Sequence, residues 1–214
     1  MKRAAATKST SQPARERNPL DRPTIVATAL RLLDEVGVDG LSTRRLAAEL
    51  GIKSASLYWH FKDKGELLNE MSGVMFEECL RRPNTADPAF DWVDWLADGC
   101  RSIRRTALSR RDGAQVMARP RPKAPNTRID FEENVKALMT SGLTDMECRL
   151  TMQTLRRFAI GAALQEQSTA NAGASVVLSG EEGFEFGLQT FIDGLKTRLA
   201  ERARITKAVR KPHA

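Results

Sequence analysis

The residues between Thr43 and Lys64 have the types and the spacing expected of a surface that reads DNA. Small and hydroxyl side chains open a predicted helix, aromatic side chains follow, and basic residues flank both. Small side chains at the start of such a helix allow close approach to base edges, while basic and hydroxyl groups bond phosphates and fix the register. We therefore predict DNA contacts from Thr43, Arg44, Lys53, Ser54, Ala55, Ser56, Tyr58, Trp59, His60, Lys62 and Lys64.

The alternative for this stretch is an ordinary helical hairpin whose aromatic residues fill a core. Tyr58, Trp59 and Phe61 lie too close together in the sequence for that to hold for all of them. Successive residues of a helix are rotated by about 100°, so these rings cannot all face inward. Some of Tyr58, Trp59 and His60 must face outward, which favours DNA reading over a purely structural role.

Two short helices joined by a tight turn must position these side chains. Gly51 ends the first helix, because glycine readily adopts the positive φ of a helix C-terminus. Ser54 or Ser56 can cap the second helix, since a side-chain oxygen there accepts a bond from an unpaired amide. Apolar residues at helical spacing seat the pair on a core, namely Leu46, Ala47, Leu50, Ile52, Leu57 and Phe61.

A supporting helix precedes this pair and a longer one follows it. Asp21 caps the first, Pro23 is tolerated in its opening turn, and Gly37 closes it before Leu41. A helix over residues 66–80 comes directly after the reading residues. Its position makes it the natural lever between the DNA-reading end and the rest of the chain.

The remainder of the chain is also predicted to be helical. Thr144 and Glu147 have the three-residue spacing of a capping box. The prolines of residues 119–125 (RPRPKAP) exclude a helix there. No stretch alternates apolar and polar residues with the period of a strand, so the fold class is all-α. Its later helices are expected over residues 91–109, 128–141, 145–167 and 181–204.

Charge divides the chain into segments. Residues 1–17 carry a net charge of +4 and residues 196–214 a net charge of +6. Because the whole chain carries +7, residues 18–195 sum to −3, which suits a protein that presents one end to DNA. We expect a disordered basic extension over 1–19, a helix-turn-helix domain over 20–65, a larger helical domain over 66–204 and a basic tail over 205–214. The extension either lies along DNA phosphates or is solvated, and both remain open.

Other function classes find little support. The sequence holds no nucleophile elbow, phosphate-binding loop or cluster of metal ligands, so we predict neither an enzyme nor a cofactor. Cys79, Cys100 and Cys148 are odd in number and widely spaced, as expected of free thiols in a reducing cytoplasm. No apolar run approaches the roughly 20 residues that span a bilayer, and no apolar segment of a signal peptide opens the chain. An architectural DNA-binding protein would not need the large acidic body.

Residues 20–68, with LSTRRLAAELGIKSASLYWHFKDKGELL at their centre, resemble the DNA-binding domain of the tetracycline-repressor (TetR-like) family. The pattern LYWHxKxK at residues 57–64 is closest to the tetracycline repressor subfamily. Residues 110–122, 157–167 and 184–199 resemble later parts of the same family. The resemblance implies a three-helix helix-turn-helix domain followed by a helical domain for effector binding and dimerisation. It also implies a repressor that binds a palindromic operator and is released by a small molecule.

Two late helices carry more apolar surface than a single chain of this size is expected to bury. The last helix repeats apolar residues at helical spacing, namely Phe184, Leu188, Phe191, Ile192, Leu195 and Leu199. The helix over 145–167 has a face of small residues at Ala159, Gly161, Ala162 and Ala163. Both helices could simply belong to the core of one chain. The resemblance implies instead a homodimer with a four-helix interface, whose two reading heads match a two-fold operator.

The resemblance also implies an effector pocket without magnesium. Met117 stands where the tetracycline repressor subfamily has a metal-binding histidine, and a thioether suits magnesium poorly. We predict a hydrophobic or aromatic effector bound by Met75, Cys79, Leu80, Gly99, Ile103, Met117, Asn134, Leu138, Phe158 and Gln165. The same residues would equally build a filled core. A regulator controlled by a protein partner, or acting without a ligand, is the alternative.

Overall fold

The computed structural model describes residues 20–79, 83–120, 125–171 and 180–209. Every regular element in these ranges is a helix and none is a strand, which confirms the all-α prediction. The helices are α1 (Arg22–Gly40), α2 (Thr43–Glu49), α3 (Ser54–Leu57), α4 (Lys64–Cys79), α5 (Trp92–Leu108), α6 (Gly113–Met117), α7 (Pro125–Met139), α8 (Asp145–Asn171) and α9 (Gly180–Val209). Among the described helices, none has the length and apolar content needed to cross a membrane.

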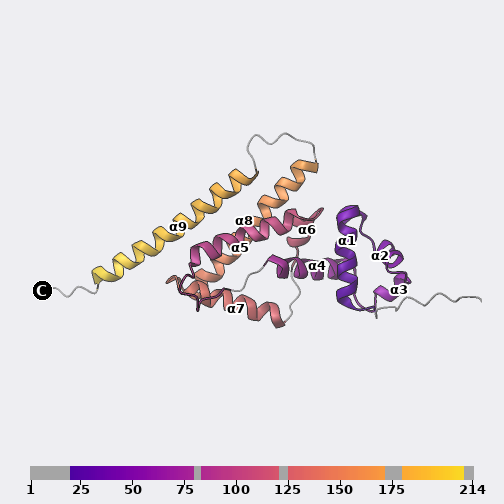
Figure 1. Ribbon diagram of the computed structural model, residues 1–214, viewed down its shortest axis with the longest axis horizontal. Coiled ribbons are helices and arrows are strands. Elements are labelled where there is room, and N and C mark those ends of the chain that lie inside the picture. The colour runs from indigo at the N-terminus through magenta and orange to yellow at the C-terminus, as the bar shows by residue number, and fades with distance from the viewer. Residues whose placement is uncertain (1–19, 80–82, 121–124, 172–179, 210–214) are drawn as a thin grey trace, which may run out of the picture.

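Helices α1, α2 and α3 form one end of the molecule, and α4 runs from them into the larger helical body (Figure 1). Ile25, Ala29 and Leu33 of α1 are fully buried and form the centre of the small unit. As predicted, the Asp21 carboxylate caps α1 by accepting a hydrogen bond from the Thr24 N–H at 2.8 Å. Pro23 lies in the first turn, where its missing N–H has no helical partner to lose.

Gly37 interrupts α1, as the sequence predicts, although a further turn follows it. Its φ of +71° and ψ of 178° belong to a backbone region that is essentially restricted to glycine. The chain then continues to Gly40, and the Leu41 N–H donates to the Gly37 carbonyl at 3.1 Å. Gly37 therefore redirects the chain toward α2.

Several element boundaries differ from the predictions. Helix α4 begins at Lys64 rather than residue 66, because Asp63 caps it by accepting from the Glu66 N–H at 2.8 Å. Helix α6 was not predicted; it follows Asp112, whose φ is +53°. Helix α7 begins at Pro125, so the prediction that 119–125 excludes helix was wrong at that residue, since proline is tolerated in a first turn.

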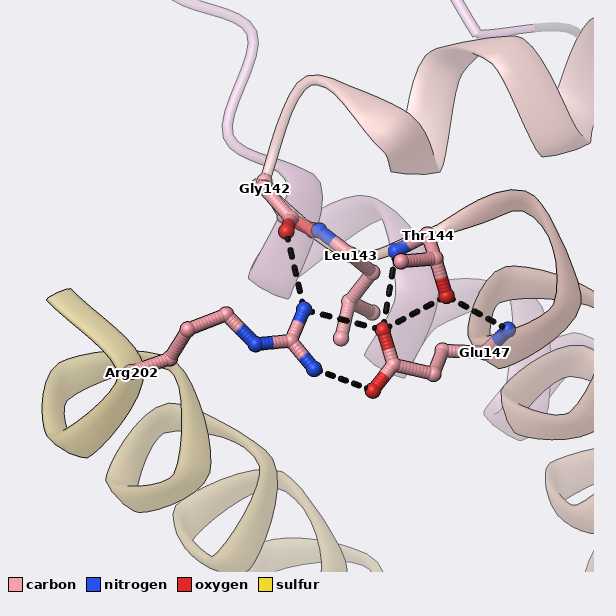
Figure 2. A network of polar contacts seen from close by, with 6 residues as sticks. Gly142, Leu143, Thr144, Glu147 and Arg202 are labelled. Carbon is pink, nitrogen blue, oxygen red and sulfur yellow. Dashed lines mark hydrogen bonds and ion pairs between the residues drawn. The ribbon is translucent and has the colours of Figure 1, made fainter. Parts of the chain in front are cut away.

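The predicted capping box at the start of α8 is present (Figure 2). The Thr144 N–H donates to Glu147 Oε2 at 2.9 Å, and the Glu147 N–H donates to Thr144 Oγ1 at 3.4 Å. Arg202 of α9 joins the same carboxylate and also reaches the Gly142 carbonyl. The Arg202 guanidinium and the Thr144 donors hold the pKa of Glu147 at about 2, below its usual value of 4.5. This network fixes the C-terminal part of α9 to the start of α8.

The apolar face of α9 belongs to the core of the single chain. Phe184, Leu188 and Ile192 are at most 3% exposed, and α9 packs against α5 and α8. The interpretation that this face exceeds what one chain can bury was therefore wrong. Among the small residues of α8, Ala159 and Ala163 are fully buried, whereas Gly161 is exposed. The large apolar side chains that point outward from these two helices include Leu164 and Phe186.

Candidate DNA interface and effector pocket

The helix-turn-helix is held together by its apolar residues. Leu46, Ala47, Leu57 and Phe61 are buried in the core that α1 and α4 share with the pair. Between the two helices, Gly51 has φ +65°, and the following Ile52 N–H donates to the Ala47 carbonyl at 2.9 Å. The turn is tight because glycine accepts this left-handed conformation without a side-chain clash.

The residues predicted to face outward do so. Trp59 is 89% exposed and Tyr58 is 58% exposed, far more than an aromatic side chain that belongs to a core. Among the other predicted DNA contacts, Arg44, Lys53, Ala55 and Lys62 are exposed, while Thr43, Ser54, Ser56 and His60 are half-buried. The structure thus places these residues on α2, at the N-cap of α3, on α3 and in the turn that follows it, whereas Lys64 is the first residue of α4. Their contacts with DNA remain a prediction.

The serine cap predicted for the second helix was wrong. The N-cap residue of α3 is Lys53, and no side chain caps this end. Ser54 already lies inside the helix, so its hydroxyl is not at the capping position. The Lys53 carbonyl instead accepts the Ser56 N–H at 2.9 Å.

Arg22 holds the segment after α3 in place, a role that the sequence did not reveal. Its guanidinium donates to the His60 carbonyl at 2.6 Å and lies 4.4 Å from the centre of the Phe61 ring. It also bonds Glu66 at 2.8 Å and Glu70 at 2.7 Å, both on α4. One side chain of α1 thereby connects the C-terminal end of the reading segment to α4.

Glu66 completes this connection. Its Oε2 accepts the Lys62 N–H at 2.7 Å, while Oε1 bonds Arg22. The Lys62 backbone donor and, after it, the Arg22 guanidinium lower the pKa of Glu66. The carboxylate therefore stays ionised at neutral pH and orders the backbone that carries the exposed aromatic residues.

Lys64 occupies a different place from the one the sequence indicated. Its Nζ donates to the Val38 carbonyl at 2.6 Å, and the side chain is half-buried. The Val38 N–H donates to Asp112 Oδ2 at 2.9 Å. Val38 of α1 is thus held through its carbonyl by Lys64 of α4 and through its N–H by Asp112, the residue before α6. An ammonium group has three donors, so a phosphate contact from Lys64 would be additional to this bond.

Two arginines add to the same junction between the small unit and the body. Arg110 pairs with Asp34 at 2.9 Å and with Glu78 at 3.5 Å. Arg111 donates to the Glu35 carbonyl at 2.9 Å. The end of α1 is therefore attached to the segment between α5 and α6 through side chains and backbone together.

A cavity of about 150 Å³ lies in the body between α4, α5, α7 and α8. Four of the predicted ligand residues line it, namely Cys79, Gly99, Ile103 and Asn134. Asn134 is only 5% exposed and supplies an amide in a mainly apolar wall. Burial raises the pKa of the Cys100 thiol to about 12, so this neighbouring side chain is neutral. The cavity can accept an apolar molecule with a few polar groups.

The other predicted ligand residues lie elsewhere. Met75, Met117 and Leu138 are fully buried in the core and do not line the cavity. The Phe158 ring stacks on Phe184 of α9 at 5.1 Å, and Gln165 lines a separate outer hollow. Leu80 lies outside the described residues. These predictions placed core residues in the pocket because an apolar residue type suits both environments equally.

Sequence reasoning missed several residues that line the cavity, among them Trp95, Ser102, Met152, Leu155 and Arg156. The first two lie on α5 and the last three on α8, where they recur at helical spacing. That spacing was visible in the sequence, yet it predicts only burial. Within the described ranges, no three His, Cys, Asp or Glu side chains gather as a metal site would require.

Comparison with known proteins identifies both units. Residues 25–71 match the description "Bacterial regulatory proteins, tetR family", and residues 84–176 match "Tetracyclin repressor-like, C-terminal domain". The class A tetracycline repressor from transposon 1721 of Escherichia coli is 35% identical over 203 residues, which cover 84% of this chain and 92% of that protein.

Solved structures show the same likeness. TetR from Acinetobacter baumannii AYE has a TM-score of 0.71 at 32% identity, covering 83% of this chain and 97% of that one. ActR from Streptomyces coelicolor in complex with (S)-DNPA has a TM-score of 0.72 at 31% identity, covering 83% and 98%. Matches of this extent to the helix-turn-helix and to the helical body show that the chain belongs to the tetR family of bacterial regulatory proteins.

Proposed function

We propose that the chain is a repressor that acts in the cytoplasm as a homodimer. It binds a palindromic operator through its helix-turn-helix and is released when a hydrophobic or aromatic small molecule enters the cavity. The proposal is supported above all by α4, which reaches both sites. Lys64 at its start is bonded to α1, and Cys79 at its end lines the cavity.

Helix α4 is suited to transmit a change between the two. Its 16 residues span roughly 24 Å at a rise of 1.5 Å per residue. In a dimer, two reading heads fit successive major grooves when they are about 34–36 Å apart. A ligand that binds more tightly to a conformation with another spacing lowers the operator affinity. The decrease is limited by the difference between the ligand's affinities for the two conformations.

The dimer rests on the outward face of α8 and α9. Leu164 is 38% exposed and Phe186 is 76% exposed, although large apolar side chains are normally buried. A second copy of the chain would cover both by two-fold symmetry. In this arrangement the exposed Arg44, Lys53 and Lys62 bond phosphates, and the start of α3 meets base edges.

The test begins with an operator selected by the full-length chain from random duplex DNA. We expect a palindromic sequence, bound with one dimer per site in light scattering. Arg44→Ala should weaken binding to all sequences and reduce the slope of log affinity against log salt by about 1, because one phosphate contact is lost. Arg105→Ala, an exposed site on α5, is the matched control and should leave the slope unchanged. A selected sequence without two-fold symmetry, or an unchanged slope for Arg44→Ala, would contradict the proposal.

A further inference from the structure

Asn134 of α7 is a buried polar side chain whose hydrogen-bonding groups the fold leaves unused. It is only 5% exposed and lines the cavity of about 150 Å³ between α4, α5, α7 and α8, here called the inner cavity. Across the described part of the chain, its side-chain amide neither donates nor accepts a hydrogen bond. An amide has two N–H donors and a carbonyl acceptor, and leaving them unpaired away from water destabilises a fold. Such a group is expected where a ligand supplies the missing partners.

The other hydrogen-bonding side chains of this wall differ from Asn134. The thiols of Cys79 and Cys100 donate to backbone carbonyls at 3.2 and 3.6 Å. Trp95 also has a partner within the chain. Ser102 of α5 is half-buried, so water can satisfy its hydroxyl. Asn134 is therefore the polar group of the wall that gains most from a bound molecule.

The charged residues in the described part of the wall leave no charge for a ligand to neutralise. The Asp98 carboxylate pairs with Arg101 at 3.2 Å, and its side chain is 71% exposed. The Arg156 guanidinium is engaged within the chain, and the centre of the Phe76 ring lies 4.6 Å from its carbon. Burial raises the pKa of the Cys100 thiol to about 12, so this group is neutral as well. An ionised ligand would lose its hydration without gaining a counter-charge, so the cavity favours a neutral molecule.

We propose that the effector is a neutral aromatic molecule with a carboxamide or lactam group, and that this group exchanges a pair of hydrogen bonds with the side chain of Asn134. The inference rests on the proposed function, since it names the chemistry of that function's ligand. A ligand amide places a donor and an acceptor side by side, so it complements both halves of the Asn134 amide at once. A cavity of about 150 Å³ is large enough for one aromatic ring, which would pack against apolar residues such as Leu96, Ile103 and Leu155.

The unused amide also predicts how the ligand-free chain responds to its removal. Leucine has nearly the shape of asparagine and no hydrogen-bonding group, so Asn134→Leu should leave Tm unchanged or raise it. A side chain that serves ligand binding lowers stability in this way, whereas an amide that holds the fold together would raise it. Scanning calorimetry without ligand measures the difference. A fall in Tm of about 3 °C or more would assign Asn134 to the fold and overturn the inference.

The binding experiment compares probes of nearly the same shape, namely benzamide, acetophenone, isopropenylbenzene and benzoate. Benzamide offers a donor and an acceptor, acetophenone only an acceptor, isopropenylbenzene neither, and benzoate a charge. Their dissociation constants for the full-length chain are measured at neutral pH by ligand-observed NMR titration, without DNA. Asn134→Leu should weaken benzamide binding by roughly 5- to 100-fold, as expected for two neutral hydrogen bonds, and acetophenone binding by roughly 2- to 10-fold, as expected for one. Isopropenylbenzene should bind the variant within about threefold of the wild type, which shows that the cavity is retained.

Gln153→Leu is the matched control. It removes an amide that lines the outer hollow and not the inner cavity, so the affinities for all four probes should stay within about twofold. Benzoate should bind the wild type roughly 10-fold more weakly than benzamide or worse, because a buried carboxylate would find no free cation.

Several binding results would overturn the inference. They are no binding of benzamide to the wild type, a preference for benzoate, an equal loss of all probes in Asn134→Leu, or a loss of benzamide binding in Gln153→Leu. Operator binding by the same preparation separates these outcomes from failure of the proposed function. If the chain binds a palindromic operator and a neutral compound without an amide releases it equally from the wild type and Asn134→Leu, the proposed function stands and the amide inference falls. If no specific DNA binding occurs, the proposed function itself is wrong.

Discussion

Replacing Arg22 by alanine removes the side chain that joins the reading segment to α1 and α4. The variant loses the bond to the His60 carbonyl, the pairs with Glu66 and Glu70, and the contact with the Phe61 ring. The Arg22 side chain is 42% exposed, so each term must be discounted for solvent screening.

The expected loss of unfolding free energy is about 2 kcal/mol. The charge-assisted bond to the carbonyl contributes about 1 kcal/mol at this exposure. The two ion pairs contribute about 0.5 kcal/mol together, and the cation–π contact about 0.5 kcal/mol. For a chain of 214 residues, this corresponds to a fall in Tm of roughly 4–8 °C.

Urea unfolding at one fixed protein concentration measures this loss. Arg31→Ala is the matched control, because Arg31 also lies on α1 and pairs with Glu35 and Glu49, yet its side chain is 55% exposed. The control should change stability by no more than about 0.5 kcal/mol. Operator affinity should fall more in Arg22→Ala than in the control, since the aromatic segment loses its anchor. Equal stabilities of the two variants would refute the role assigned to Arg22.

Three further outcomes are expected. As the pH falls from 4.5 toward 2, the wild type should lose the stability that it gains from the ion pair of Glu147 with Arg202. The pKa of Glu147 is lower in the folded than in the unfolded chain, so this stability is fully present above the pKa of the unfolded chain and disappears as the pH falls through the pKa of the folded chain. Glu147→Gln should show a shallower loss of stability in acid titrations followed by circular dichroism. Gly37→Ala should destabilise the fold by about 1–3 kcal/mol in urea, since φ is +71° and the new Cβ would lie 2.4 Å from Asp112 Oδ2; an unchanged midpoint would contradict this. Trp59→Ala should leave Tm within about 1 °C, because the ring is 89% exposed, yet it should weaken operator binding in fluorescence anisotropy.

The parts of the fold that could be predicted depend on local geometry. The 100° rotation between helical residues was enough to place Tyr58 and Trp59 outside, and a three-residue spacing was enough to find the capping box at Thr144. The contacts of Arg22 depend on residues about 40 positions away along the chain, and no local pattern specifies them.

The pocket was harder to predict for a different reason. Met117 and Ile103 are both apolar helical residues, yet the first is packed in the core and the second lines the cavity. Residue type predicts that a side chain is buried, but it does not predict whether neighbouring atoms fill the space beside it. Sequence reasoning missed Arg156 because an arginine on a long helix is normally a solvated residue.

The bonds to both sides of Val38 bear on how such proteins can be recombined. Its carbonyl depends on Lys64, at the start of α4, and its N–H depends on Asp112, far along the chain. A hybrid that takes residues up to the start of α4 from this chain and the rest from a relative would keep the first bond only if it includes Lys64. It would keep the second bond only if the relative that supplies the body also has an acidic residue at the position of Asp112. A hybrid that exchanges the helix-turn-helix must therefore take residues 34–38, 64 and 110–112 from the same parent protein.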